Sequence, residues 1–164
     1  MIVVADATPL RYLVLIGEVE ILPALYGRVL TPPGVLTELT QPRTPESVRR
    51  WVTQPPRWLE IRAPQRPLPA SPATLGVGEQ EAIALAEELK ADVLLVDDWA
   101  GRREAERRHL PIQGTLGLLG LAAQHDLTEL PNALTRLRQT NFRASARLIQ
   151  DLLDRDAERR KPHP

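Results

Sequence analysis

The 164-residue chain has no cysteine, and this absence excludes disulfide bonds and thiolate metal ligands. It also has almost no lysine, since every basic residue other than Lys90 and Lys161 is an arginine. The 21 basic residues are balanced by 21 acidic ones, so positive charge is not in excess. The zero net charge excludes a generally basic surface that would coat nucleic acid, but it allows a local basic patch.

Long apolar runs are absent as well. No segment approaches the roughly 20 apolar residues that a membrane-spanning helix needs. The N-terminus lacks the basic segment and the long apolar run that are typical of a signal peptide. We therefore expect a cytoplasmic protein that makes no contact with a membrane.

The length of the chain suits one compact domain with a sizeable core, and the sequence contains no internal repeats. The one linker-like stretch, residues 63–74, is rich in proline and has no apolar periodicity. We interpret it as a surface connection within a single domain that spans residues 1–164. Residues 159–164 are interpreted as a tail.

Short apolar segments alternate with helical patterns along the whole chain. This alternation predicts an α/β fold with a mostly parallel sheet. Strands are predicted at residues 2–5, 28–32, 58–62, 92–96 and 110–114. Helices are predicted at residues 8–16, 18–26, 32–41, 44–54, 79–90, 100–109, 115–126, 131–139 and 145–160.

Two of the predicted strands end directly in acidic residues. Asp6 follows the strand at 2–5, and the pair Asp97 and Asp98 follows the strand at 92–96. The carboxyl ends of parallel strands share one edge of the sheet, where ligands of such folds bind. Glu38 and Glu79 lie in helices that begin near the same edge if the crossovers are regular. The sequence therefore predicts a cluster of carboxylates at this edge.

Each acid also has a simpler explanation. Asp6 and Asp98 could cap the helices that follow them. Glu79 could interact favourably with the dipole at its helix N-terminus, and Glu38 could lie on a solvated face. Together, however, clustered carboxylates repel one another and lose hydration, so a fold keeps them mainly to hold a cation.

An oxygen-only site of this kind suits Mg²⁺ or Mn²⁺ rather than Zn²⁺. The three histidines, His109, His125 and His163, share no ligand spacing and are expected at the surface.

Four segments resemble those of PIN-domain proteins, in the compact prokaryotic branch similar to toxin ribonucleases of toxin–antitoxin pairs. They are "VVADATPLRYLVLIGEVEIL", "VLTPPGVLTEL", "LGVGEQEAIALAEELKADVLLVDDWAGRREAERRHLPIQGTLGLL" and "NFRASARLIQDLL". They occur in the expected order and span nearly the whole chain. The resemblance implies a three-layer α/β/α sandwich with a pit of acids that binds Mg²⁺ or Mn²⁺.

The resemblance also implies roles for individual residues. Asp6 matches the first acid of the pit, Glu38 the second and Glu79 the acid that opens the central helix. Many family members have aspartate at this last position. Glu81 is an alternative to Glu79, but it lies about 200° around the helix, so both cannot face the pit. The remaining residues implied are Asp97 or Asp98 as the acid after the following strand, and Thr8 as a supporting hydroxyl.

The function implied by the resemblance is a Mg²⁺- or Mn²⁺-dependent endoribonuclease, the toxin of a toxin–antitoxin pair. Metal-activated water would cleave the phosphodiester bond to leave 5′-phosphate and 3′-hydroxyl ends, with Glu38 orienting the water or binding an ion. The implied partners are RNA and an antitoxin that blocks the pit. A homodimer could form through an apolar helix such as that at 115–124, although burial in the core is the default for such helices.

The helix at 100–109 is the candidate contact with RNA. It carries Arg102, Arg103, Arg107 and Arg108, and Trp99 precedes it as a surface on which a base could stack. The alternative is a solvated helix face on which these arginines pair with Glu104 and Glu106. Trp99 could instead pack under a loop.

Three other functions fit the sequence less well. A phospho-accepting receiver domain needs a lysine after a late strand, and neither lysine of the chain is placed there. A dehalogenase-type phosphatase would have a second aspartate where this chain has Thr8. A catalytically silent interaction module on the same fold would be expected to lack the acids, which are all present.

Overall fold

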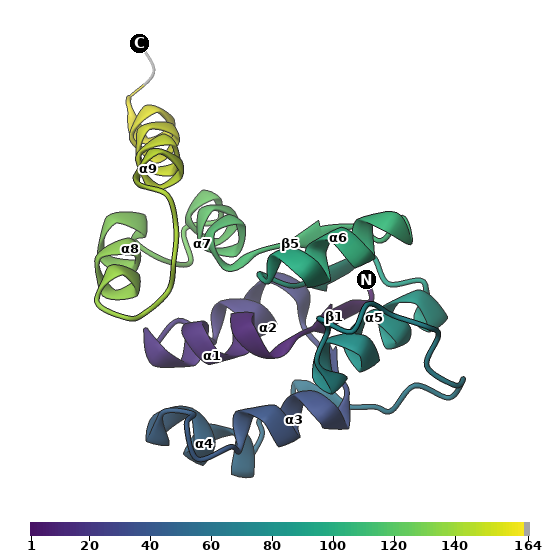
Figure 1. Cartoon of the computed structure of the whole chain (residues 1–164). Helices are drawn as coiled ribbons and strands as arrows, with labels where there is room; N and C mark the ends of the chain where they lie inside the picture. The colour runs from purple at the N-terminus through teal and green to yellow at the C-terminus, as the bar shows by residue number, and fades with distance from the viewer. Residues whose placement is uncertain (163–164) are drawn as a thin grey trace.

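Five short strands form one parallel sheet at the centre of the computed structural model, which describes residues 1–162 (Figure 1). Their order across the sheet is β3-β2-β1-β4-β5. Each strand lies inside its predicted segment, so the predicted α/β fold with a parallel sheet is confirmed. The strands are β1 (Val3–Ala5), β2 (Val29–Thr31), β3 (Leu59–Ile61), β4 (Val93–Leu95) and β5 (Ile112–Gln113).

The central strand β1 is buried on both faces, which explains its unbroken apolar sequence. The chain runs from β1 outward to β2 and β3, then returns and continues on the other side as β4 and β5. The direction of winding therefore changes between β1 and β4. In parallel sheets such a switch point leaves a crevice at the carboxyl ends of the two strands.

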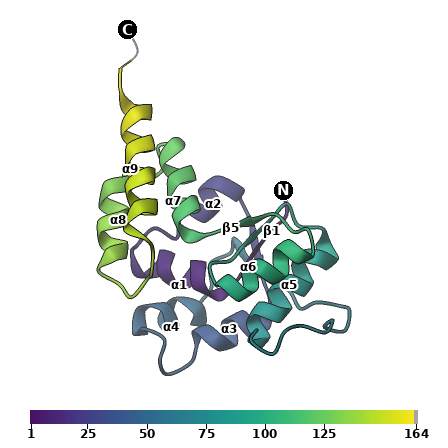
Figure 2. The same ribbon diagram turned by 45° about the horizontal axis from the view of Figure 1, so that its top comes forward.

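Helices cover the sheet and complete an α/β/α sandwich. Helices α7, α8 and α9 pack on one another beyond α1, and α9 carries the chain away from the sheet towards the C-terminus (Figures 1 and 2). The helices are α1 (Ala7–Leu15), α2 (Ile21–Tyr26), α3 (Pro33–Leu39), α4 (Glu46–Thr53), α5 (Val77–Leu89), α6 (Trp99–Arg107), α7 (Thr115–Gln124), α8 (Leu130–Arg138) and α9 (Ala146–Arg160).

The predicted surface connection at 63–74 and the predicted tail at 159–164 differ in their structure. Residues 63–74 form neither helix nor strand and run between β3 and α5 (Figure 2). At the C-terminus α9 continues to Arg160, so the first two residues of the predicted 159–164 tail are helical. His163 lies outside the described residues. No helix within residues 1–162 is long and apolar enough to cross a membrane.

Helices α3 and α5 approach each other closely where a glycine of each helix meets. A Cβ added to Gly78 would lie 3.2 Å from the carbonyl oxygen of Gly34. The amide of Gly34 in turn donates a hydrogen bond of 2.7 Å to Oε2 of Glu81. This crossing brings α3, which carries Glu38, against the first turn of α5, which carries Glu79.

We expect the substitution Gly78→Ala to lower the free energy of unfolding by about 1–3 kcal/mol, because its methyl group would press on the backbone of α3. Gly120→Ala in α7 is the matched control. Its methyl group would lie 3.3 Å from the end of the flexible Leu152 side chain, which can move aside. Urea unfolding of both variants measures the difference. Equal stabilities would show that the α3–α5 crossing has room for the added methyl group.

Candidate acidic site at the carboxyl edge of the sheet

The acids after β1 and β4 lie side by side because these strands are neighbours. Ala5 pairs with Leu95 in register, so Asp6 lies one residue past the end of β1 and Asp97 lies two residues past the end of β4. The amide of Asp6 donates a hydrogen bond of 2.9 Å to the carbonyl of Leu95, which fixes the chain here. The site therefore occupies the switch point of the sheet.

Asp6 is the most deeply buried of these acids, with 1% of its surface exposed. Within residues 1–162 its Oδ1 has no hydrogen-bond partner, and its side chain makes no capping bond to α1. Burial is the main reason that the pKa of Asp6 rises to about 8, and the charges of Glu79, Glu38 and Asp97 add to the effect. The amide of Ala7 opposes this rise in pKa. Helix capping therefore does not explain this aspartate.

Glu79 lies in the first turn of α5, and its Oε2 is buried without a partner among the described residues. Burial is the main reason that the pKa of Glu79 rises to about 7, and the charges of Asp98 and Glu38 add to the effect. Glu81 instead turns to α3, where it accepts the hydrogen bond from Gly34. Of the two alternatives on α5, Glu79 is the one that faces the other acids.

Glu38 borders the open side of the acidic site. The residue is exposed overall, but its Oε2 lies against α5, only 3.3 Å from where a Cβ on Gly78 would be. Burial raises the pKa of Glu38, Asp98 raises it further, and the guanidinium of Arg11 lowers it. The sequence pattern did not predict Arg11 as a residue of the site. The feature of the sequence that could have indicated Arg11 is its position one helical turn after Thr8, which is partly buried in the first turn of α1.

Asp97 and Asp98 have different surroundings. Thr115, the first residue of α7, donates to both oxygens of Asp97, from its amide at 2.8 Å and from its hydroxyl at 2.6 Å. Burial raises the pKa of Asp97, while the bonds from Thr115 and the charge of Arg102 lower it. Thr115 was also not anticipated.

Asp98 is exposed and caps α6, since its Oδ2 accepts a hydrogen bond of 3.1 Å from the amide of Gly101. This capping does not remove it from the acidic site. A Cβ on Gly101 would lie 3.8 Å from Oε2 of Glu79 and 4.0 Å from Oδ2 of Asp98. The two carboxylates therefore border the same small space over Gly101.

The donor set of the site fits a hard divalent cation. Two buried carboxylate oxygens, on Asp6 and Glu79, have no partner among the described residues. No three acidic or histidine side chains of residues 1–162 form a ready-made ligand cluster. Mg²⁺ is commonly held by one or two carboxylates, keeps several waters and is completed by substrate phosphates. This arrangement therefore fits Mg²⁺ or Mn²⁺ better than a metal that needs four protein ligands.

The arginines of α6 divide into two groups. Arg107 and Arg108 bind Glu104, one of the two partners that the alternative interpretation of this helix named, but Glu104 is buried and so does not belong to a solvated face. Arg102 and Arg103 have no ion-pair partner within the part of the chain that the structure describes. Arg102 lies beside Asp97, whereas Arg103 stacks over the ring of Trp99.

A family model described as PIN domain matches residues 2–158, which include all the acids of the site. No curated protein and no solved structure matches the chain.

Without metal, we expect the stability of the folded protein to decrease as the pH rises from about 5 to about 8. In the unfolded chain Asp6 and Glu79 titrate near 4, whereas in the folded protein their pKa values are about 8 and about 7. The folded state therefore binds more protons across this interval, and the free energy of unfolding decreases with pH. At about 1.4 kcal/mol per pKa unit, the three pH units between 5 and 8 correspond to about 4 kcal/mol for Asp6 alone.

Urea unfolding in EDTA across this pH range measures the effect, and Asp6→Asn should remove most of it. Glu104 does not interfere, because hydrogen bonds from Arg107 and Arg108 lower its pKa to about 2 and keep it ionised throughout. A wild-type stability that is constant or rises with pH would contradict the burial of two protonated carboxyl groups.

Proposed function

This chain belongs to the PIN-domain family, and we propose that it is a Mg²⁺- or Mn²⁺-dependent endoribonuclease. PIN domains are generally nucleases, and the fold is of the nuclease type. The observation that supports the proposal most is the pair of buried carboxylate oxygens of Asp6 and Glu79 that lack partners among the described residues. A fold has little reason to keep such a pair unless a cation neutralises it.

Asp6 and Glu79 would hold the ion, and Asp98, which faces Glu79 across Gly101, would be the third acid. When bound, the ion would lower the pKa of a coordinated water and neutralise charge on the phosphodiester. Asp97 stays oriented by Thr115 next to Asp6. The two hydrogen bonds from Thr115 leave Asp97 less free to move than Asp98. We therefore assign Asp97 a supporting role, in which it contributes negative charge to the site.

Glu38 would orient the attacking water and accept its proton, a role supported by its position at the open side and its raised pKa. The water oxygen forms a bond to phosphorus as the bond to the 3′-oxygen of the preceding ribose breaks. The products are a 3′-hydroxyl end and a 5′-phosphate end. Thr8, in the first turn of α1, would support the acids from the protein side.

The proposed biological role is that of a cytoplasmic toxin whose activity an antitoxin blocks at the acidic site. The helix considered for a homodimer, α7, packs against α1, α8 and α9, and most of its apolar residues are buried within the chain. A homodimer would therefore need another surface. The second candidate function, a catalytically silent interaction module, is favoured only if the acids bind no metal.

We expect Asp6→Asn to lower the rate of RNA cleavage by more than about 100-fold, the cost of losing one preorganised charge contact. In EDTA the variant should be as stable as the wild type or more so, because asparagine needs no proton or cation to be buried there and no capping bond is lost. Mg²⁺ at 100 times its Kd should stabilise the wild type by about 2.7 kcal/mol and the variant by little. Cleavage assays and thermal melting, each with EDTA and with Mg²⁺, make the comparison.

Two outcomes would contradict this assignment. Equal cleavage by the wild type in EDTA and in Mg²⁺ would exclude a metal-dependent reaction. Equal stabilisation of both proteins by Mg²⁺ would mean that the ion binds elsewhere. Glu81→Gln is the matched control, because Glu81 lies on the same helix as Glu79 but turns to α3. It should keep the stabilisation by Mg²⁺.

We expect Arg102→Ala to weaken RNA binding and to reduce its salt dependence. Arg102 is exposed next to Asp97 without an ion-pair partner in residues 1–162, so it is available to a phosphate. Losing one phosphate contact on a single strand should reduce the slope of log K against log salt by about 0.7. Arg107→Ala on the same helix should leave the slope unchanged, because Glu104 already neutralises Arg107. Titrations at several salt concentrations measure both slopes.

A further inference from the structure

A cavity of about 660 Å³ lies directly beside the acidic site, between α6 and the proline-rich segment 63–74. Pro72 and Thr74 line one side, and Trp99 and Arg103 line the other. Trp99 is 68% exposed, which is unusual for so large an apolar side chain. It immediately follows Asp98 in the sequence, so one residue of the cavity wall adjoins an acid of the site.

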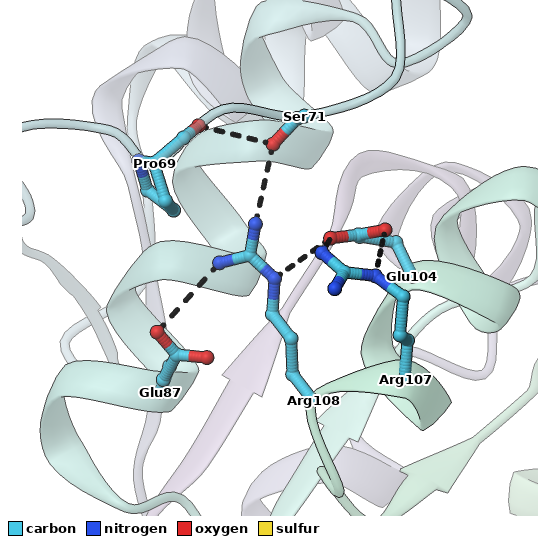
Figure 3. Close-up of polar contacts among 6 residues, drawn as sticks. All are labelled: Pro69, Ser71, Glu87, Glu104, Arg107 and Arg108. Carbon is cyan, nitrogen blue, oxygen red and sulfur yellow. Dashed lines mark hydrogen bonds and ion pairs between the residues drawn. The ribbon is translucent and has the colours of Figure 1, made fainter.

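The wall of this cavity is held in place by a set of polar contacts (Figure 3). Glu104, which is 4% exposed, accepts hydrogen bonds from Arg107 and Arg108. Arg108 also reaches Ser71 at 3.4 Å and Glu87 on α5 at 3.7 Å. The segment that carries Pro72 is thereby tied to both α5 and α6. A ligand would meet a formed cavity rather than a loose loop.

The charges around the cavity favour a neutral planar ligand. Glu104 and Arg107 neutralise each other, and Glu106 balances Arg103, so there is no surplus of positive charge for a phosphate. The guanidinium of Arg103 lies 4.7 Å from the centre of the Trp99 ring and covers part of it. The exposure of Trp99 leaves the remaining surface of the indole open to a second flat group.

We propose that this cavity binds one unpaired nucleobase of the substrate strand, stacked on Trp99, while a neighbouring phosphate of the same strand lies at the acids. The proposal rests on the proposed function and specifies its substrate as single-stranded near the cleaved bond. Stacking on an aromatic side chain tolerates every base, because each base has a flat face. A base in a duplex is already stacked and would have to leave the helix first.

The test is a set of single-stranded RNA oligonucleotides with one cleavage site, in which an abasic nucleotide replaces each position around that site in turn. In the wild type we expect one position to lower kcat/KM by about 5- to 150-fold, the measured range for one stacked base. In Trp99→Ala the same abasic position should change kcat/KM by less than about twofold. Trp99→Phe, which keeps a stacking face, should retain most of the wild-type effect.

Binding provides a second readout that does not need cleavage. In EDTA, Trp99→Ala should weaken binding of the intact oligonucleotide by a similar factor and should bind the matching abasic oligonucleotide as the wild type does. Leu148→Ala is the control, because Leu148 is 47% exposed but lies on α9, far from α6 in Figure 1. It should change neither readout.

The proposal is overturned if no abasic position has an effect in the wild type, or if the effect is the same in Trp99→Ala. A protein partner would then be the remaining candidate ligand of the cavity. These outcomes differ from failure of the proposed function, in which the wild type cleaves no RNA with any divalent ion. In that case only the binding measurement tests the base site. Equal affinity of Trp99→Ala and the wild type for the intact oligonucleotide then overturns it.

Discussion

The structure depends on one electrostatic constraint, the burial of a carboxyl group at the end of the central strand. The strand β1 lies between β2 and β4 in the middle of the sheet, and the next residue, Asp6, is only 1% exposed. At neutral pH such a group must keep a proton or have a cation beside it. The negative charges of the surrounding acids make the proton of Asp6 harder to remove, and they also favour the binding of a cation. The geometry of the sheet thereby sets the chemistry of its edge.

The rest of the site limits the cost of holding several acids together. Thr115 fixes Asp97 from the start of α7, and Asp98 is anchored by the amide of Gly101. The glycine pair at the α3–α5 crossing lets Glu38 approach without displacing Glu79. Among the carboxylates of residues 1–162, only those of Asp6 and Glu79 keep a buried oxygen without a partner. The stability that the fold gives up is therefore concentrated on the two groups that a cation would neutralise.

The sequence was sufficient for the fold and for the region of the site, but not for the choices within it. The apolar segments and the acids that end them predict the strands, their direction and the shared edge. Glu79 could be separated from Glu81 only by seeing that Gly34 binds Glu81. Arg107 could be separated from Arg103 only by seeing that Glu104 is buried. Such distinctions depend on contacts between elements far apart in the chain, which local patterns do not encode.

The tether between the proline-rich segment and α6 has an evolutionary consequence. The acids stand on the ends of β1 and β4, whereas residues 63–74 only border the site and are anchored through Ser71 and Arg108. Doubling the length of a flexible connection costs only about 0.6 kcal/mol in closure entropy. Insertions and deletions between β3 and α5 could therefore accumulate at little thermodynamic cost, altering the shape of the cavity beside Trp99 while the carboxylates stay in register. Under the proposed function, substrate preference could diverge in this way while the acidic site stays unchanged.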